Sequence, residues 1–158
     1  RSLYLDPTNV DMRHQLVGIL FHMGLNHEAA AVLTDGIRRE PDAMSLVATL
    51  AWLRATCPDD AVRNADQAIK LAERVCEAEG YQDPFSLRTL AAAQAESGCF
   101  ESAVATAEKA QRMALERGRG ELVALLNRDL DAYRAGQPWR EPPPTTQPVT
   151  TTAPSEST

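Results

Sequence analysis

The chain has 158 residues, a net charge of −6 at pH 7 and only 5% aromatic residues. This acidic balance argues against a nucleic-acid partner, which would need clustered Lys and Arg, and it is compatible with a basic peptide or protein. The three cysteines have no paired spacing, which argues against a disulfide framework or a zinc site and favours a reducing compartment such as the cytoplasm. No apolar run reaches the roughly 18 residues that a membrane span needs.

Abundant alanine predicts closely packed helices and therefore an all-α fold. The first helix is expected over about residues 9–23, with Thr8 as its N-cap. Its apolar stripe has helical spacing and consists of Leu16, Ile19, Leu20 and Met23. Asn26 is expected to cap a second helix over 27–39, and Pro41 ends this unit. The inward side chains of the second helix are expected to be Ala29, Ala30, Leu33 and Ile37.

Two further helices are expected over 42–56 and 61–79, separated by a turn at 57–60. The carboxylates of Asp59 and Asp60 are expected to cap the helix over 61–79, and no catalytic pairing is expected of them. The inward side chains are expected to be Leu46, Leu50, Leu53, Ala65, Ala68, Ile69, Ala72 and Val75.

The last helices are expected over 84–97, 101–117 and 121–135, and Asp83 and Pro84 open the first of them. The buried face of the final helix is expected to be Leu122, Leu125, Leu126, Leu130 and Tyr133, with the polar side chains, among them Arg128 and Asp129, outside. Such an unpaired amphipathic helix is typical of a cap on a helical array. From residue 138 onward, six Pro and six Thr predict a tail that cannot offset its chain entropy, and a bare flexible end is favoured over an O-glycosylated stalk.

The spacing of this pattern resembles a tetratricopeptide (TPR) repeat. Pro7 and Pro41 lie 34 residues apart, and the patterned positions between them hold Leu16, Leu20, Gly24, Ala29 and Leu33. The later units match with Val47, Leu50, Ala51, Ala65, Ile69 and Ala72, and with Leu87, Leu90, Ala91, Gly98, Phe100, Ala103, Ala107 and Ala110. The match departs at Arg13, where the family has an aromatic residue, and at Val17. The second unit is about six residues longer than the period.

The resemblance implies a right-handed TPR solenoid of about three helix pairs plus a C-terminal capping helix. It divides the chain into the end of a truncated upstream repeat (1–7), a TPR domain (8–136) and a disordered Pro/Thr-rich tail (137–158). The stretches 49–60, 83–93 and 133–138 are similar to the C-terminal ends of long bacterial TPR proteins. Some of these have a membrane-embedded, glycosyltransferase-like N-terminal half, so the soluble end of a membrane-anchored protein is an alternative to the cytoplasm. The open N-terminal repeat face is a candidate for self-association.

In a TPR array the first helix of each pair lines a concave groove. Carried onto this chain, the groove positions are Asp11, His14, Gly18, Phe21, His22, Ser45, Ala48, Trp52, Ala55, Phe85, Arg88, Ala92 and Glu96. The predicted binding residues among them are His14, Phe21, His22, Trp52, Phe85 and Arg88, because aromatic residues and Arg dominate interface hot spots. Trp52 and Phe21 have a second interpretation as packing residues, since each lies next to a core leucine, and Arg88 is expected to be exposed in the groove.

Other chemistry is not indicated. His14 and His22 are two helical turns apart, about 12 Å, which is too far to share one metal ion. The carboxylate clamp of chaperone-binding TPR domains is absent, because its positions hold His14, Gly18, Trp52, Arg88 and Ala92, of which only Arg88 is suitably basic. Cys57 and Cys99 lie in turns where a thiol could be exposed, but neither has a base nearby in sequence, which favours inert thiols. No nucleophile motif or phosphate loop occurs, so neither an enzyme nor a cofactor is expected.

These features predict a non-catalytic scaffold that binds a protein or peptide in the concave groove. Two alternatives stay open. The segment is a structural cap of a longer TPR array without a ligand of its own, or it is the partner- or substrate-positioning module of a membrane glycosyltransferase-like protein.

Overall fold

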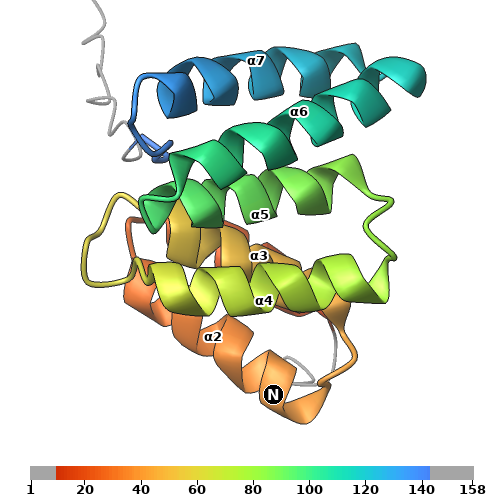
Figure 1. Ribbon diagram of the computed structural model, residues 1–158. Helices are drawn as coiled ribbons and strands as arrows, with labels where there is room; N and C mark the ends of the chain where they lie inside the picture. The colour runs from red at the N-terminus through yellow and green to blue at the C-terminus, as the bar shows by residue number, and fades with distance from the viewer. Residues whose placement is uncertain (1–9, 143–158) are drawn as a thin grey trace, which may run out of the picture.

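The computed structural model describes residues 10–142, and this part of the chain forms seven α-helices and no strand (Figure 1). The helices are α1 (Val10–His22), α2 (Asn26–Arg39), α3 (Met44–Thr56), α4 (Ala65–Ala78), α5 (Pro84–Glu96), α6 (Phe100–Glu116) and α7 (Gly120–Arg134). The all-α class is therefore confirmed. Each predicted helix is present, and only the start of α4 differs from its predicted position by more than two residues. The predicted cap Thr8 and the repeat end 1–7 lie outside the described residues.

The helices form a stack in which each one packs against the next in sequence (Figure 1). In addition, α5 packs against both α3 and α7, whereas α1 and α3 are not closely packed. We call the surface formed by α1, α3, α5 and α7 the odd-helix face. None of the helices between residues 10 and 142 combines the length and apolarity that a membrane crossing requires.

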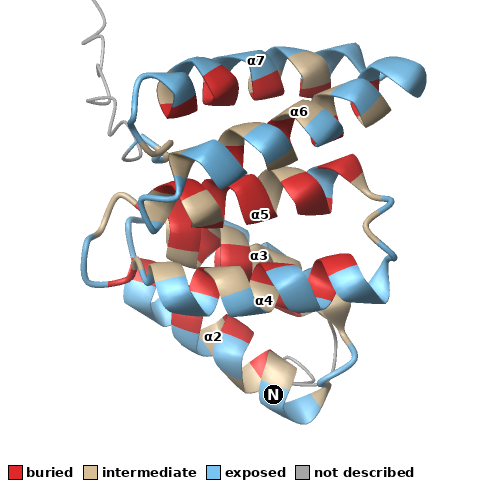
Figure 2. Ribbon diagram, viewed as in Figure 1, coloured by how far each residue is buried: buried red, intermediate tan, exposed pale blue. Residues whose placement is uncertain are grey.

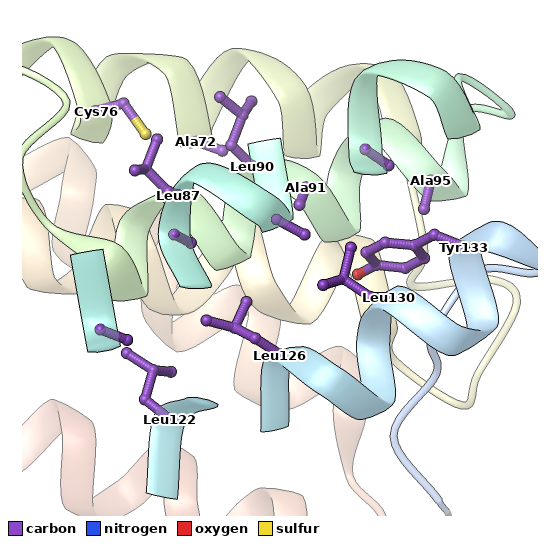
Figure 3. Close-up of a cluster of buried hydrophobic side chains, with 14 of the residues drawn as sticks. Ala72, Cys76, Leu87, Leu90, Ala91, Ala95, Leu122, Leu126, Leu130 and Tyr133 are labelled. Carbon is purple, nitrogen blue, oxygen red and sulfur yellow. The ribbon is translucent and has the colours of Figure 1, made fainter. Parts of the chain in front are cut away.

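The hydrophobic core consists of two main clusters, and its buried stripes face neighbouring helices (Figure 2). The N-terminal cluster joins α1, α2 and α3 around Leu33 and Leu46. The C-terminal cluster joins α4 to α7 around Leu87 and Leu126, and Figure 3 shows the ring of Tyr133 next to Leu130 at one end of it. The contribution of α6 is a row of fully buried alanines, whose small side chains let its neighbours approach closely: Ala103, Ala107, Ala110 and Ala114.

The buried stripe of α1 differs from the prediction. Ile19 and Met23 are 57% and 65% exposed, whereas Arg13 and Val17 are buried. Arg13 reaches α2, where Nη2 donates to Asp35 Oδ2 at 3.0 Å and Nη1 donates to a backbone carbonyl at 3.0 Å. These bonds compensate for the desolvation of the guanidinium, so an arginine occupies a position where the repeat pattern has an aromatic residue. The hydrogen bond from Arg13 is also the main effect that lowers the pKa of Asp35.

Of the three predicted N-caps within the described residues, one is confirmed. Asp83 accepts a backbone N–H in the first turn of α5 at 2.9 Å. Asn26, in contrast, is the first residue of α2, and its buried Oδ1 has no hydrogen-bond partner among the described residues. The cap of α4 is Asn64, while Asp59 closes only the turn before it. The start of α4 moves because Val62 is fully buried in the N-terminal cluster, which holds the chain in a longer turn.

Candidate binding groove

A cavity of about 400 Å³ lies between α1 and α3, where these two helices are not closely packed. Its lining residues are His14, Val17, Gly18, Phe21 and His22 from α1, Thr49, Trp52 and Leu53 from α3, and Glu141. Four of the six predicted binding residues therefore line one cavity: His14, Phe21, His22 and Trp52. Gly18 keeps the cavity open, because a Cβ atom built there has no neighbouring atom within 4 Å.

Two hydrogen bonds involve residues of the cavity wall, one between α1 and α3 and one between α3 and the chain after α7. His14 Nε2 lies 3.2 Å from Ser45 Oγ, so the imidazole on α1 is hydrogen-bonded to the start of α3. Trp52 Nε1–H donates to Glu141 Oε1 at 3.2 Å. The cavity thus combines apolar walls with a few hydrogen-bonding groups, which is the usual composition of a ligand pocket. Within the described part of the chain, no group of three or more His, Cys, Asp or Glu side chains could hold a metal ion.

Trp52 fits both of its sequence interpretations. The ring is partly buried, and it packs against the alanines that join α3, α4 and α5. It also lines the cavity, and the guanidinium of Arg88 lies 4.4 Å from its ring centroid. Trp52 therefore supports the helices and forms part of the cavity wall.

Arg88 is not exposed in a groove, and here the sequence prediction is wrong. Its side chain is only 12% exposed, and Nε donates to Asp129 Oδ2 at 2.6 Å. Asp129, which was expected outside, is fully buried. The helical period contains the signal that would have found it, because Asp129 lies seven residues after Leu122 and four before Tyr133, on the buried stripe of α7.

Phe85 lies apart from the four predicted binding residues that line the cavity. Its ring is exposed and lines a separate hollow of about 280 Å³ beside the start of α7. The guanidinium of Arg119 lies 4.8 Å from the ring centroid. The structure therefore does not bring Phe85 into the cavity between α1 and α3.

The chain turns back after α7, and residues 138–141 lie against the odd-helix face (Figure 1). We call this stretch the C-terminal segment. Trp139 packs on the C-terminal cluster beneath the guanidinium of Arg128, which lies 3.6 Å from its ring centroid. Arg140 Nη2 donates to Glu96 Oε1 at 3.3 Å, and the backbone N–H of Glu141 donates to the Thr56 carbonyl at 2.8 Å.

The expectation of an unstructured tail therefore does not hold for the C-terminal segment. Sequence reasoning missed it because the prolines and threonines of 138–158 dominate the composition, while its contacts come from one aromatic and two charged residues. The segment lies over part of the predicted groove on α5, where Ala92 is fully buried and the Glu96 side chain is 12% exposed. The remainder of the predicted tail, from residue 143, lies outside the described residues.

The two cysteines predicted in turns have different environments. Cys57 is fully buried, and burial raises the pKa of its thiol, whereas Cys99 is exposed. Cys76 is also buried in the C-terminal cluster, where burial raises the pKa of its thiol to about 11. Burial, followed by the nearby charge of Asp129, raises the pKa of Tyr133 as well. A buried thiol with a raised pKa is a poor nucleophile, so Cys57 and Cys76 are packing residues.

Comparison with protein-family models, with curated proteins and with solved structures found no match to this chain. The geometry of the odd-helix face therefore provides the basis for a functional proposal.

Proposed function

We propose that this chain is a non-catalytic, TPR-like scaffold that binds an extended peptide or a protein segment in the cavity between α1 and α3. The observation that carries the proposal is the convergence of His14, Phe21, His22 and Trp52 on one cavity of about 400 Å³. This volume lies within the range of roughly 300 to 1,000 Å³ that is typical of ligand sites. A right-handed TPR solenoid is part of the proposal: the packing of α5 against both α3 and α7 supports a stack of helix pairs, and the right hand is what the resemblance implies.

The cavity walls indicate which part of a peptide would enter. Val17 and Leu53 are buried at its base, and Phe21 and Trp52 flank them, so an apolar side chain fits between the two helices. His14 and Thr49 add hydrogen-bonding groups at the wall for the peptide backbone. One buried apolar anchor with polar groups around it is the usual anatomy of a binding hot spot.

Gly18 offers a direct test, because it lines the cavity and a Cβ atom built there has no neighbouring atom within 4 Å. Peptides would first be selected from a random library against the wild-type chain. We expect Gly18→Leu to weaken their binding at least about tenfold, as measured by calorimetry, because the leucine occupies the space of the peptide anchor. Ala105→Leu, at an exposed site on α6, is the matched control and keeps wild-type affinity. Equal affinities of Gly18→Leu and the wild-type chain would contradict the proposal.

A structural cap of a longer helical array is the second candidate. It is favoured by the contrast between α7, whose outward side chains are mostly polar, and α1, which exposes Ile19 and Met23. These apolar side chains would be covered by a preceding helix pair or by a second copy. In this case no library peptide binds in the cavity, and the Ile19→Lys, Met23→Lys double variant abolishes any concentration-dependent association in sedimentation velocity.

A further inference from the structure

We propose that the odd-helix face contains a second peptide site, formed by α3, α5 and α7, whose present occupant is the C-terminal segment. The site would accept in trans an extended peptide that carries an aromatic, a basic and an acidic residue in that order. The proposal rests on the proposed function only in assuming that this face binds peptides. It assigns a partner chemistry, which the cavity between α1 and α3 does not by itself specify.

The occupant shows which chemistry the site recognises, because three successive residues meet three different helices. The ring of Trp139 lies 3.6 Å from the Arg128 guanidinium of α7. Arg140 Nη2 lies 3.3 Å from Glu96 Oε1 of α5, an oxygen that also accepts a hydrogen bond from Arg63 at 3.1 Å. Glu141 meets α3 twice, through its backbone N–H to the Thr56 carbonyl and through its carboxylate to the indole of Trp52. Aromatic, basic and acidic side chains each therefore have a complementary partner.

The receptor side of this site has contacts of its own between the helices. Trp52 stacks on Arg88 at 4.4 Å, and Arg88 pairs with the buried Asp129 at 2.6 Å. Arg128 lies 3.6 Å from the same carboxylate and presents its guanidinium to Trp139. The pair of Arg88 and Asp129 at the centre of this series is held by α5 and α7, whereas Trp52 and Arg128 at its two ends also contact the segment, so the helices fix the centre of the site before an aromatic ring docks at its α7 end.

The docked state leaves one polar atom of the segment and one of the site without a hydrogen bond. Trp139 Nε1–H and Glu96 Oε2 are buried without a hydrogen-bond partner among the described residues. A buried polar group without a partner weakens the state that contains it. The short connection from α7 instead favours the segment through an effective concentration in the millimolar range. A separate peptide lacks this connection, so its binding becomes measurable once the segment's own docking is weakened.

The test uses the full chain with Trp139→Ala, labelled with ¹⁵N, and an unlabelled, end-blocked peptide of residues 137–142. Because the chain has two tryptophans, the variant has a single labelled indole, that of Trp52. We expect the peptide to shift this indole signal saturably toward its wild-type position. The wild-type chain should bind the peptide at least about tenfold more weakly, because its own segment occupies the site. Leu115→Ala, an exposed site on α6, is the control variant and should behave as wild type.

Peptides with Trp139→Ala or Glu141→Ala are expected to lose the shift. The absence of a saturable shift in a variant with native circular dichroism, or equal binding of the peptide without tryptophan, would overturn the proposal. If Trp139→Ala does not fold, the Arg140→Ala, Glu141→Ala double variant replaces it, since both side chains are at least partly exposed. The sedimentation coefficient of the wild-type chain provides a further check. If it rises with concentration and Trp139→Ala lowers it, the site binds a second copy of the chain, and the proposal of a separate peptide partner is overturned.

The two proposals fail in different ways. The library peptides report on the cavity between α1 and α3, and their binding is tested by Gly18→Leu. The peptide of residues 137–142 reports on the site of α3, α5 and α7, and its binding is tested by Trp139→Ala. Trp52 and Glu141 belong to both sites, so library peptides whose binding Trp139→Ala alters are set aside. A negative result with the remaining library peptides, or with the peptide of residues 137–142, then leaves the other proposal standing.

Discussion

At the scale of single residues, the ion pair between Arg88 and Asp129 is the most consequential contact that the sequence did not predict. Asp129 is fully buried, and the Arg88 side chain is 12% exposed. Removal of one partner from a buried pair leaves the other charge without compensation, which costs about 3 to 5 kcal/mol. We therefore expect Asp129→Ala to lower the free energy of unfolding by about this amount in urea titrations. Asp131→Ala, on the exposed side of the same helix, should change it by less than about 0.5 kcal/mol. Similar losses in both variants would contradict this view of the pair.

Two glycines predict opposite effects of the same substitution. A Cβ atom at Gly36 would lie 2.8 Å from Arg13 Cδ and 2.9 Å from Leu46 Cδ1, both in the buried N-terminal region. Overpacking of this kind costs about 1 to 3 kcal/mol, against a gain of about 1 kcal/mol in helix propensity. We expect a net loss of about 1 kcal/mol for Gly36→Ala. Gly18→Ala, in open space, should gain up to about 1 kcal/mol. Thermal unfolding of the two variants measures both signs, and destabilisation by Gly18→Ala would contradict the open cavity wall.

The three thiols should differ sharply in reactivity. Cys99 is exposed, while Cys57 and Cys76 are buried with raised pKa values, about 11 for Cys76. The thiolate is the reactive form, and a raised pKa lowers its fraction at any pH below that value. At pH 8 we expect iodoacetamide to modify one thiol of the folded chain and all three after unfolding, as counted by mass spectrometry. In Cys99→Ser, the folded chain should stay unmodified over the same time.

At the scale of helices, the cap of α4 has a specific energetic signature. Asn64 Oδ1 accepts the N–H of Gln67 at 3.0 Å, although the sequence pattern favoured the preceding aspartates. Loss of such a cap costs typically about 1 kcal/mol. Asn64→Ala should therefore lower the free energy of unfolding by about this amount, whereas Asn64→Asp keeps an acceptor and should be nearly neutral. Chemical denaturation of the two variants separates the cap from other roles of the side chain, and an equal loss in both would argue against it.

The sequence predicted the existence and ends of the helices because their signals are local. Gly24 and Gly98, for example, have positive φ angles and end helices where predicted. Which side of a helix is buried was less predictable, because it depends on distant partners. The burial of Arg13 depends on Asp35 of the next helix, and that of Arg88 depends on Asp129, 41 residues away. The cavity residues of α1 and α3 were found through the repeat pattern, whereas Trp139 was missed because its contacts are non-local.

At the scale of the whole molecule, the stack is asymmetric. α5 packs against α3, α4, α6 and α7, whereas α1 packs closely only against α2. The two main core clusters are joined by a small third cluster that is rich in alanine, namely Ala55, Ala68, Ala92 and Ala93. In stacked helical arrays, stability is approximately a sum of terms from each unit and its neighbours. The end of the stack at α1 should therefore open at a lower free energy than its centre.

Hydrogen exchange measures this difference directly. We expect backbone amides of α1 to exchange fastest among the helices and those of α5 to exchange slowest, near the rate set by global unfolding, because local opening reflects the number of packed neighbours. Asp129→Ala should reduce the protection of α5 and α7 more than that of α1, since the ion pair joins only the first two. Uniform protection from α1 to α7 would instead indicate that the two core clusters unfold as one cooperative unit. In that case the alanine contacts between α3, α4 and α5 would couple the two ends of the stack more strongly than their small side chains imply.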